Sequence, residues 1–122
     1  MRMEEERPIF LQLADQLEDG ILSGAYPEDG QVPSITEFSV ACKINPATAL
    51  KGINRLVEDG LLYKKRGVGM FVSPGARETL RQRRRERFFE EYIRRAVSEA
   101  RRLELTDGEI LAMMKRGLSD VD

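Results

Sequence analysis

The sequence predicts a mainly α-helical fold with one small β-hairpin, and two patterns carry that prediction. Apolar residues recur at three- and four-residue steps in most segments, which is the spacing of amphipathic helices. Two short apolar and aromatic runs flank a glycine-containing turn at 66–69, which is typical of a hairpin. With 122 residues, of which 41% are apolar, the chain can build one compact domain and a smaller appendage.

The first helix is expected to begin at Pro8, because proline suits a first helical position, and to end at Gly24, which can cap it. Its apolar stripe consists of Phe10, Leu13, Leu17 and Ile21. The segment 25–31 that follows contains Pro27 and Gly30, so it is expected to be a loop.

The second helix is expected to begin with the capping box Ser34-Ile-Thr-Glu37, in which each end residue can bond the other's backbone amide. Phe38 and Ala41 follow on its core side, and Cys42 is expected as a small buried side chain near its end. A tight turn at 43–45 then leads to the third helix.

The third helix is expected to have Asn45 as its N-cap and Pro46 as its first residue, and to end at Gly60. Its buried stripe consists of Leu50, Ile53, Leu56 and Val57. Two short helices around such a turn form a helix-turn-helix. The strands 61–65 and 70–72, joined by Arg66-Gly-Val-Gly69, would add a wing to it.

A second, helical part is expected at 76–122, so that residues 1–75 form the winged helix-turn-helix domain. A long helix starts near Ala76 and carries a basic run at 81–87, which is interpreted as a solvated face. Thr106-Asp-Gly-Glu109 is a second capping box, and it opens a last helix that should stop at Gly117. These helices would form a C-terminal helical hairpin.

The composition argues against catalysis and metal binding. The chain has no histidine and one cysteine, so the common zinc ligands and the commonest general base are missing. It has no P-loop and no nucleophile motif, and we therefore expect neither enzyme activity nor a cofactor. No apolar run approaches the roughly 20 residues of a membrane span, and no signal peptide is recognisable, which predicts a cytoplasmic protein without membrane partners.

Residues 8–72 resemble the GntR family of bacterial regulators, which share this helix order and a basic, glycine-containing wing. The resemblance rests on Val32-Pro-Ser34, Val57-Glu-Asp-Gly-Leu-Leu62 and Lys64-Lys-Arg-Gly-Val-Gly-Met-Phe-Val72. Ile44-Asn-Pro-Ala-Thr48 and the short C-terminal part are similar to the YtrA subgroup. The resemblance implies a transcription regulator, in particular a repressor. Many family members have arginine at the position of Thr36, so the phosphate or guanine contact of that arginine is not expected in this chain.

Three groups of residues are expected at DNA. The exposed face of the third helix would enter the major groove, where Lys51 can donate to guanine or phosphate. The start of the second helix suits a phosphate, and the wing suits the minor groove. The expected contacts are Ser34, Thr36, Asn45, Ala47, Thr48, Lys51, Arg55, Lys64, Lys65, Arg66 and Gly67.

The C-terminal apolar stripe is expected to form a homodimer interface, so that the dimer reads both halves of a palindromic operator. The interface residues are Phe89, Tyr92, Ile93, Ala96, Ala100, Leu103, Ile110, Met113 and Met114. A small apolar effector is a further expectation, near Phe89, Tyr92 and Met113.

Two alternatives stay open at this point. The stripe can pack on its own DNA-binding domain, and the winged helix can be a protein-interaction module without a specific operator. Residues 1–75 hold 8 Lys/Arg and 11 Asp/Glu, which favours the interaction module. Lys51 with Thr48 and the basic wing favour DNA, which would have to bind a local positive face rather than a general basic coat.

Overall fold

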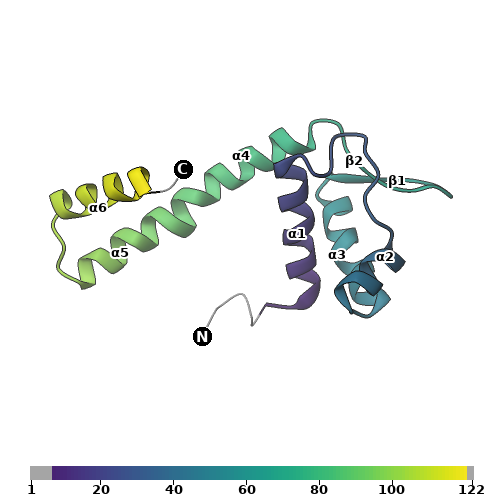
Figure 1. Cartoon of the computed structure of the whole chain (residues 1–122), viewed down its shortest axis with the longest axis horizontal. Helices are drawn as coiled ribbons and strands as arrows, with labels where there is room; N and C mark the ends of the chain where they lie inside the picture. Colours follow the sequence, from purple (N-terminus) through teal and green to yellow (C-terminus); the bar gives the residue numbers. More distant parts are fainter. Residues whose placement is uncertain (1–6, 121–122) are drawn as a thin grey trace. The chain divides into compact units, whose positions relative to one another are not determined.

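The computed structural model describes residues 7–120 and divides into two compact units, Met1–Arg81 and Gln82–Asp122. The N-terminal unit contains α1 (Ile9–Ser23), α2 (Ile35–Cys42), α3 (Pro46–Glu58), β1 (Leu62–Lys65), β2 (Gly69–Val72) and the start of α4 (Ala76–Phe88). The C-terminal unit continues with the π-helical turn η2 (Phe89–Ile93), α5 (Arg94–Arg102) and α6 (Asp107–Asp120) (Figure 1). The predicted mainly helical fold with one hairpin is confirmed.

The core of the N-terminal unit forms where α1 packs on α3. The two helices come close together because Gly52 has no side chain: a Cβ there would lie 2.9 Å from the carbonyl oxygen of Phe10. The buried cluster consists of Leu13, Ala14, Leu17, Ile21, Val32, Phe38, Ala49, Ile53, Leu56, Leu61, Leu62, Val72, Ala76 and Leu80. Since the first turn of α4 belongs to this core, the unit extends past the expected boundary at 75 to Arg81.

The ends of α1 and the start of α2 follow the capping signals of the sequence with one small difference. Gly24 ends α1 in a left-handed conformation with φ 85°, as predicted, but Pro8 is the N-cap of α1 rather than its first helical residue. The amide of Glu37 donates to Ser34 Oγ at 3.1 Å, and the amide of Ser34 donates to Glu37 Oε1 at 3.0 Å. The capping box of α2 is therefore confirmed.

Five apolar side chains of the N-terminal unit are less buried than predicted. Leu50 is 42% exposed, Ala41 and Cys42 are exposed, and Phe10 and Val57 are only half-buried. The prediction that Leu50 faces the core is wrong because the buried face of α3 consists of Ala49, Gly52, Ile53 and Leu56. Phe38 is the one buried residue of α2, so Ala41 and Cys42 on this short helix are exposed to solvent.

The wing is an antiparallel pair of strands in which Leu62 pairs with Val72 and Lys65 pairs with Gly69. The amide of Val68 donates to the carbonyl of Lys65 at 2.9 Å and closes the turn. Gly67 has a φ of 76° within that turn, which is a backbone conformation that glycine adopts without strain. The buried Leu61 precedes the first strand instead of belonging to it.

The C-terminal helices differ from the prediction in two details. A π-helical turn at Phe89–Ile93 separates α4 from α5, where one uninterrupted helix was expected. The helix α6 continues through Gly117 to Asp120, because Gly117 does not adopt the left-handed backbone of a helix-ending glycine. Within residues 7–120, no helix is long and apolar enough to cross a membrane.

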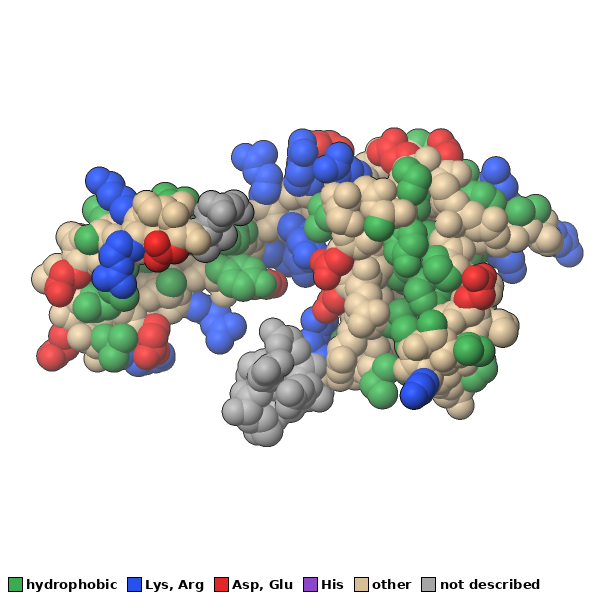
Figure 2. Space-filling model, in the orientation of Figure 1, with side chains coloured by type: hydrophobic (Ala, Val, Ile, Leu, Met, Phe, Trp, Pro, Cys, Tyr) green, Lys and Arg blue, Asp and Glu red, His purple; other side chains and the backbone are tan. Residues whose placement is uncertain are grey.

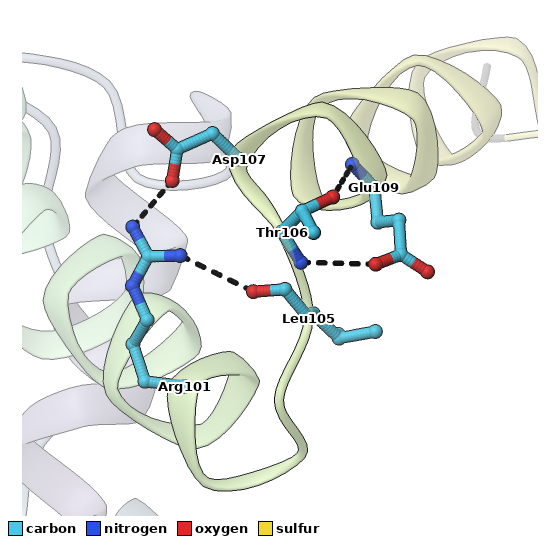
Figure 3. A network of polar contacts seen from close by, with 5 residues as sticks. All are labelled: Arg101, Leu105, Thr106, Asp107 and Glu109. Carbon is cyan, nitrogen blue, oxygen red and sulfur yellow. Dashed lines mark hydrogen bonds and ion pairs between the residues drawn. The ribbon is translucent and has the colours of Figure 1, made fainter.

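The turn between α5 and α6 is fixed by polar contacts (Figure 3). The amide of Glu109 donates to Thr106 Oγ1 at 3.1 Å, and the amide of Thr106 donates to Glu109 Oε1 at 3.0 Å, which confirms the second capping box. The Arg101 guanidinium donates to the carbonyl of Leu105 at 3.2 Å and to the carboxylate of Asp107. These contacts involve five residues between 101 and 109, at the closed end of the helical hairpin.

Candidate nucleic-acid interface

The exposed face of α3 carries most of the predicted base-reading residues. Ala47, Lys51 and Arg55 are exposed, and Thr48 is half-buried. Leu50 and Asn54 share the exposed surface, although the sequence analysis placed Leu50 in the core and did not consider Asn54. Hydroxyl, amide, cationic and apolar groups therefore lie together on one helix, which is the mixture that reads base edges in a major groove.

Lys51 has a partner within its own domain. Its ammonium lies 4.2 Å from the centre of the Phe10 ring, in a cation–π contact with the start of α1. The half-buried Phe10 ring thus packs against a charged residue. Lys51 would have to leave the ring to reach a base. This contact is not predictable from the sequence, because the two residues are far apart in the chain.

The start of α2 offers donors to a phosphate together with one opposing charge. Ser34 Oγ accepts from the amide of Glu37, and the exposed Thr36 adds a second hydroxyl. Hydrogen bonds from the backbone and then the side chain of Ser34 lower the pKa of Glu37, whose carboxylate is negatively charged at neutral pH. A phosphate bound here would meet both the hydroxyls and this negative charge.

Asn45 has the capping role that the sequence predicts. Its Oδ1 accepts from the amide of Ala47 at 2.7 Å and begins α3. The capping bond uses only the oxygen of the exposed side-chain amide, so the nitrogen can still donate to a phosphate or a base. The cap and a DNA contact are therefore compatible in this residue.

The wing carries two kinds of basic residue. Lys64 and Arg66 are exposed and have no ion-pair partner among residues 7–120. The ammonium of Lys65 instead lies 4.4 Å from the centre of the Phe71 ring and 6.0 Å from that of Tyr63. Figure 2 shows Lys and Arg side chains at the free end of the hairpin, beside the turn that contains Gly67.

The wing tip also exposes an apolar side chain that the sequence analysis missed. Val68 is 60% exposed between Gly67 and Gly69, so it cannot belong to the core of this domain. An apolar residue flanked by glycines within a basic turn was the available signal. Its position suits contact with the sugar and base surfaces of a groove.

The predicted dimer residues are mostly uncovered in the single chain. Phe89, Tyr92, Ala96, Leu103, Met113 and Met114 are exposed, and Ile93 and Ile110 are half-buried. Ala100 is buried within its own unit, so it is the one predicted interface residue that is already covered. Four further apolar residues are exposed that the predicted interface does not include, namely Phe88, Val97, Leu111 and Leu118.

A hollow of about 360 Å³ lies within this apolar surface, between α5 and α6. Its lining includes Ala96, Leu103, Ile110, Met113 and Met114. Met113 is the only one of the three residues predicted near an effector that lines it, and the effector itself stays a prediction. Within residues 7–120, no group of three or more His, Cys, Asp or Glu side chains is placed to hold a metal ion.

Known proteins resemble both parts of the chain. A structure described as a putative transcriptional regulator of the GntR family from Bacteroides thetaiotaomicron is 32% identical, with a TM-score of 0.74 over 92% of this chain and 97% of that one. The HTH-type transcriptional repressor YtrA of Bacillus subtilis is 30% identical over 73 residues, which are 60% of this chain and 56% of YtrA.

The N-terminal unit also resembles a domain seen on DNA. The DNA-binding domain of AraR in complex with operator ORE1 is 30% identical, with a TM-score of 0.54 over 55% of this chain and 82% of that one. The family described as bacterial regulatory proteins, gntR family, matches residues 10–72, which contain α1, α2, α3 and the wing. Because this match covers more than half of the chain, the protein belongs to the gntR family of bacterial regulatory proteins.

Proposed function

We propose that the protein is a transcription repressor that binds a palindromic operator as a homodimer and belongs to the YtrA subgroup. The observation that carries the proposal is the exposed face of α3 beside a basic wing in one compact unit. The similarity to the operator-bound domain of AraR and to the repressor YtrA supports it. Binding an operator would place the protein in the bacterial cytoplasm.

The two DNA-facing elements have different tasks in this proposal. Lys51, Asn54 and Thr48 on α3 would contact base edges in the major groove, where hydrogen-bond patterns distinguish the base pairs. Lys64 and Arg66 on the wing would contact phosphates and the minor groove, which contributes affinity more than sequence preference. The acidic balance of the domain is then compatible with binding, because these cations are concentrated on one element.

The dimer is proposed because the C-terminal unit has almost no buried core of its own. Among residues 82–120, Ala100 is the only buried residue, while nine large apolar side chains at 88–118 are exposed. Folded units of about 40 residues usually need a metal, a disulfide or a partner chain, because they cannot bury enough surface alone. This unit has no cysteine, so we propose a second copy of the chain as its cover.

Two copies would also explain operator specificity. One helix-turn-helix contacts a few base pairs, whereas a two-fold dimer contacts two half-sites separated by about one turn of DNA or a multiple of it. The two-fold arrangement makes the operator palindromic, since each half-site meets the same surface. Linking both contacts raises specificity without any additional base contact.

The competing function is a protein-interaction module, which the excess of acidic residues at 1–75 favours. A gel shift with the region upstream of the protein's own gene separates the two functions. We expect a retarded band that survives an excess of random duplex and disappears with an excess of unlabelled upstream DNA. A band equally sensitive to both competitors, or no band, would contradict the repressor proposal.

A further inference from the structure

The segment between α1 and α2 pairs with the outer edge of the wing. The amide of Asp29 donates to the carbonyl of Val72 at 2.8 Å, and the amide of Val72 donates to the carbonyl of Gly30 at 3.0 Å. The amide of Val32 then donates to the carbonyl of Met70, also at 3.0 Å. The two-stranded wing therefore has a third extended segment along β2.

Two side chains of this segment reach further along the wing. Gln31 Nε2 donates to the carbonyl of Val68 at 3.0 Å, at the tip of the turn. The hydroxyl of Tyr63 on β1 donates to Asp29 Oδ1 at 2.9 Å, and this bond raises the pKa of Tyr63. The segment 29–32 is thus bonded to both strands and to the turn between them.

Gly69 makes room for the contact of Gln31. A Cβ at Gly69 would overlap the side-chain amide of Gln31, and the φ of Gly69 is 146°, which side-chain-bearing residues rarely adopt. The composition of the turn favours flexibility, because glycines precede and follow Val68. Glycine loses more backbone freedom than any other residue when it is ordered. The bond from Gln31 is the side-chain hydrogen bond that reaches this turn from outside the hairpin.

We propose that Gln31 is a positioning residue that holds the wing tip in the orientation in which Arg66 meets DNA. The proposal rests on the proposed function, because it takes the wing to contact DNA. Gln31 orders the turn before DNA binds. The free energy needed to order the turn therefore does not weaken binding. Ser34 follows Gln31 closely and caps α2, so one short segment fixes both predicted phosphate-facing elements.

The test compares Gln31→Met with Gln16→Met. Methionine has a similar length and no donor, and Gln16 is an exposed residue of α1 away from the wing, so it is the matched control. The first measurement is the backbone order parameter of 67–69 from ¹⁵N relaxation of the DNA-free protein. We expect about 0.85 in the wild type and in the control, and below about 0.6 in Gln31→Met, with the core helices unchanged.

The second measurement is the affinity for a duplex that the wild-type protein selects from a random-sequence pool. Gln31→Met should bind about fivefold more weakly, which corresponds to one net hydrogen bond, and should show the smaller salt dependence expected of Arg66→Ala. Because both changes act through one contact, the double variant should lose little more than Arg66→Ala alone. A purely structural role would instead give additive losses.

The outcomes separate this proposal from the proposed function. Equal order parameters at 67–69 in Gln31→Met and wild type would overturn the positioning role, whether or not DNA binds. A loosened tip with unchanged affinity, or additive losses in the double variant, would overturn the link to Arg66. If the wild type selects no duplex, the proposed function fails, and the role of Gln31 at DNA fails with it.

Discussion

Gly52 has a strong effect on which residues of α3 are available to DNA. A Cβ at this position would meet the Phe10 carbonyl at 2.9 Å and Leu13 Cδ2 at 3.1 Å, so the close packing of α1 depends on its absence. That packing brings Ala49 inward and leaves Leu50 42% exposed. The missing side chain of Gly52 thus favours the rotation of α3 that buries Ala49 and exposes Leu50.

Lys51→Ala should weaken binding to a selected operator duplex by about 1–3 kcal/mol, the range for a good base contact. Lys51 lies on the exposed face of α3, and its partner in the free protein is the Phe10 ring. The measurement is a titration at fixed salt, with Lys115→Ala in α6 as a control for the loss of one positive charge. An affinity equal to that of the control would remove Lys51 from the base-reading residues.

Glu37→Gln should remove a pH dependence of stability. The pKa of Glu37 is lowered by its bonds to Ser34, so the carboxylate stabilises the fold fully above its ordinary pKa of 4.5. This contribution is lost as the pH falls through the lowered pKa, whereas the neutral amide does not titrate. Urea unfolding of both proteins between neutral and acidic pH measures their free energies of unfolding. On acidification, the free energy of unfolding of the wild type should fall relative to that of Glu37→Gln. A difference that is constant with pH contradicts the capping role of this charge.

Single residues could be predicted where their role is local. Asn45 and Ser34 were correctly predicted as caps because the signal lies within three residues of the helix start. Leu50 was predicted wrongly because Leu50, Ile53 and Leu56 have helical spacing, as Ala49, Ile53 and Leu56 also have. Only the packing of α1 on Gly52 distinguishes the two patterns, and that contact is not local.

At the scale of elements, the wing has one basic side chain that is exposed in the turn and a neighbouring one that contacts aromatic rings of the sheet. Arg66 is exposed in the turn, whereas the ammonium of Lys65 lies over the stacked rings of Tyr63 and Phe71, whose centres are 5.8 Å apart. Cation–π contacts of this kind contribute to the folded state before DNA is present. The two neighbouring cations should therefore differ in their effect on binding.

Arg66→Ala should lower the slope of log affinity against log salt by about 0.9, the value for one lost phosphate contact. Lys65→Ala should lower it less, but should reduce the stability of the hairpin because the aromatic pair loses its cover. Binding to random duplex at several salt concentrations measures the slopes, and thermal unfolding measures stability. Equal slopes for the two variants would show that the Lys65 ammonium leaves the rings to bind phosphate.

The elements themselves were largely predictable, and their limits were less so. Helix starts and the hairpin follow capping residues and glycines close in sequence, and these were confirmed. The continuation of α6 through Gly117 was missed because a glycine ends a helix only when the backbone turns left-handed there. The prediction of a loop at 25–31 does not include the pairing of 29–32 with β2, because this pairing depends on contacts distant in the chain.

At the scale of the whole molecule, the C-terminal unit accounts for most of the unexplained apolar surface. Tyr92 is 64% exposed and lies near Phe88 in a tilted aromatic pair with centres 5.8 Å apart. Apolar side chains are visible over much of the helical hairpin in Figure 2. A surface of this kind is typical of an interface rather than of an isolated unit.

Tyr92→Asp should dissociate the proposed dimer, because a charge buried without a partner costs several kcal/mol. Its exposure in the single chain means that the change leaves no cavity in the monomer. Val40→Asp on α2 is the matched control, since Val40 is 73% exposed in the other unit. Sedimentation at micromolar concentration should show a monomer for the first variant and a dimer for the second. A dimer in both variants would place the dimer interface away from Tyr92.

A dimer of this chain should read a two-fold operator, and selection of duplexes from a random-sequence pool can measure this. The wild-type protein should enrich an inverted repeat whose half-site centres lie about 10 base pairs apart or at a multiple of this spacing. Tyr92→Asp should enrich at most a single half-site, since its α3 is intact. A pool that stays random after repeated selection by the wild type, or an enriched motif without two-fold symmetry, would contradict the claim.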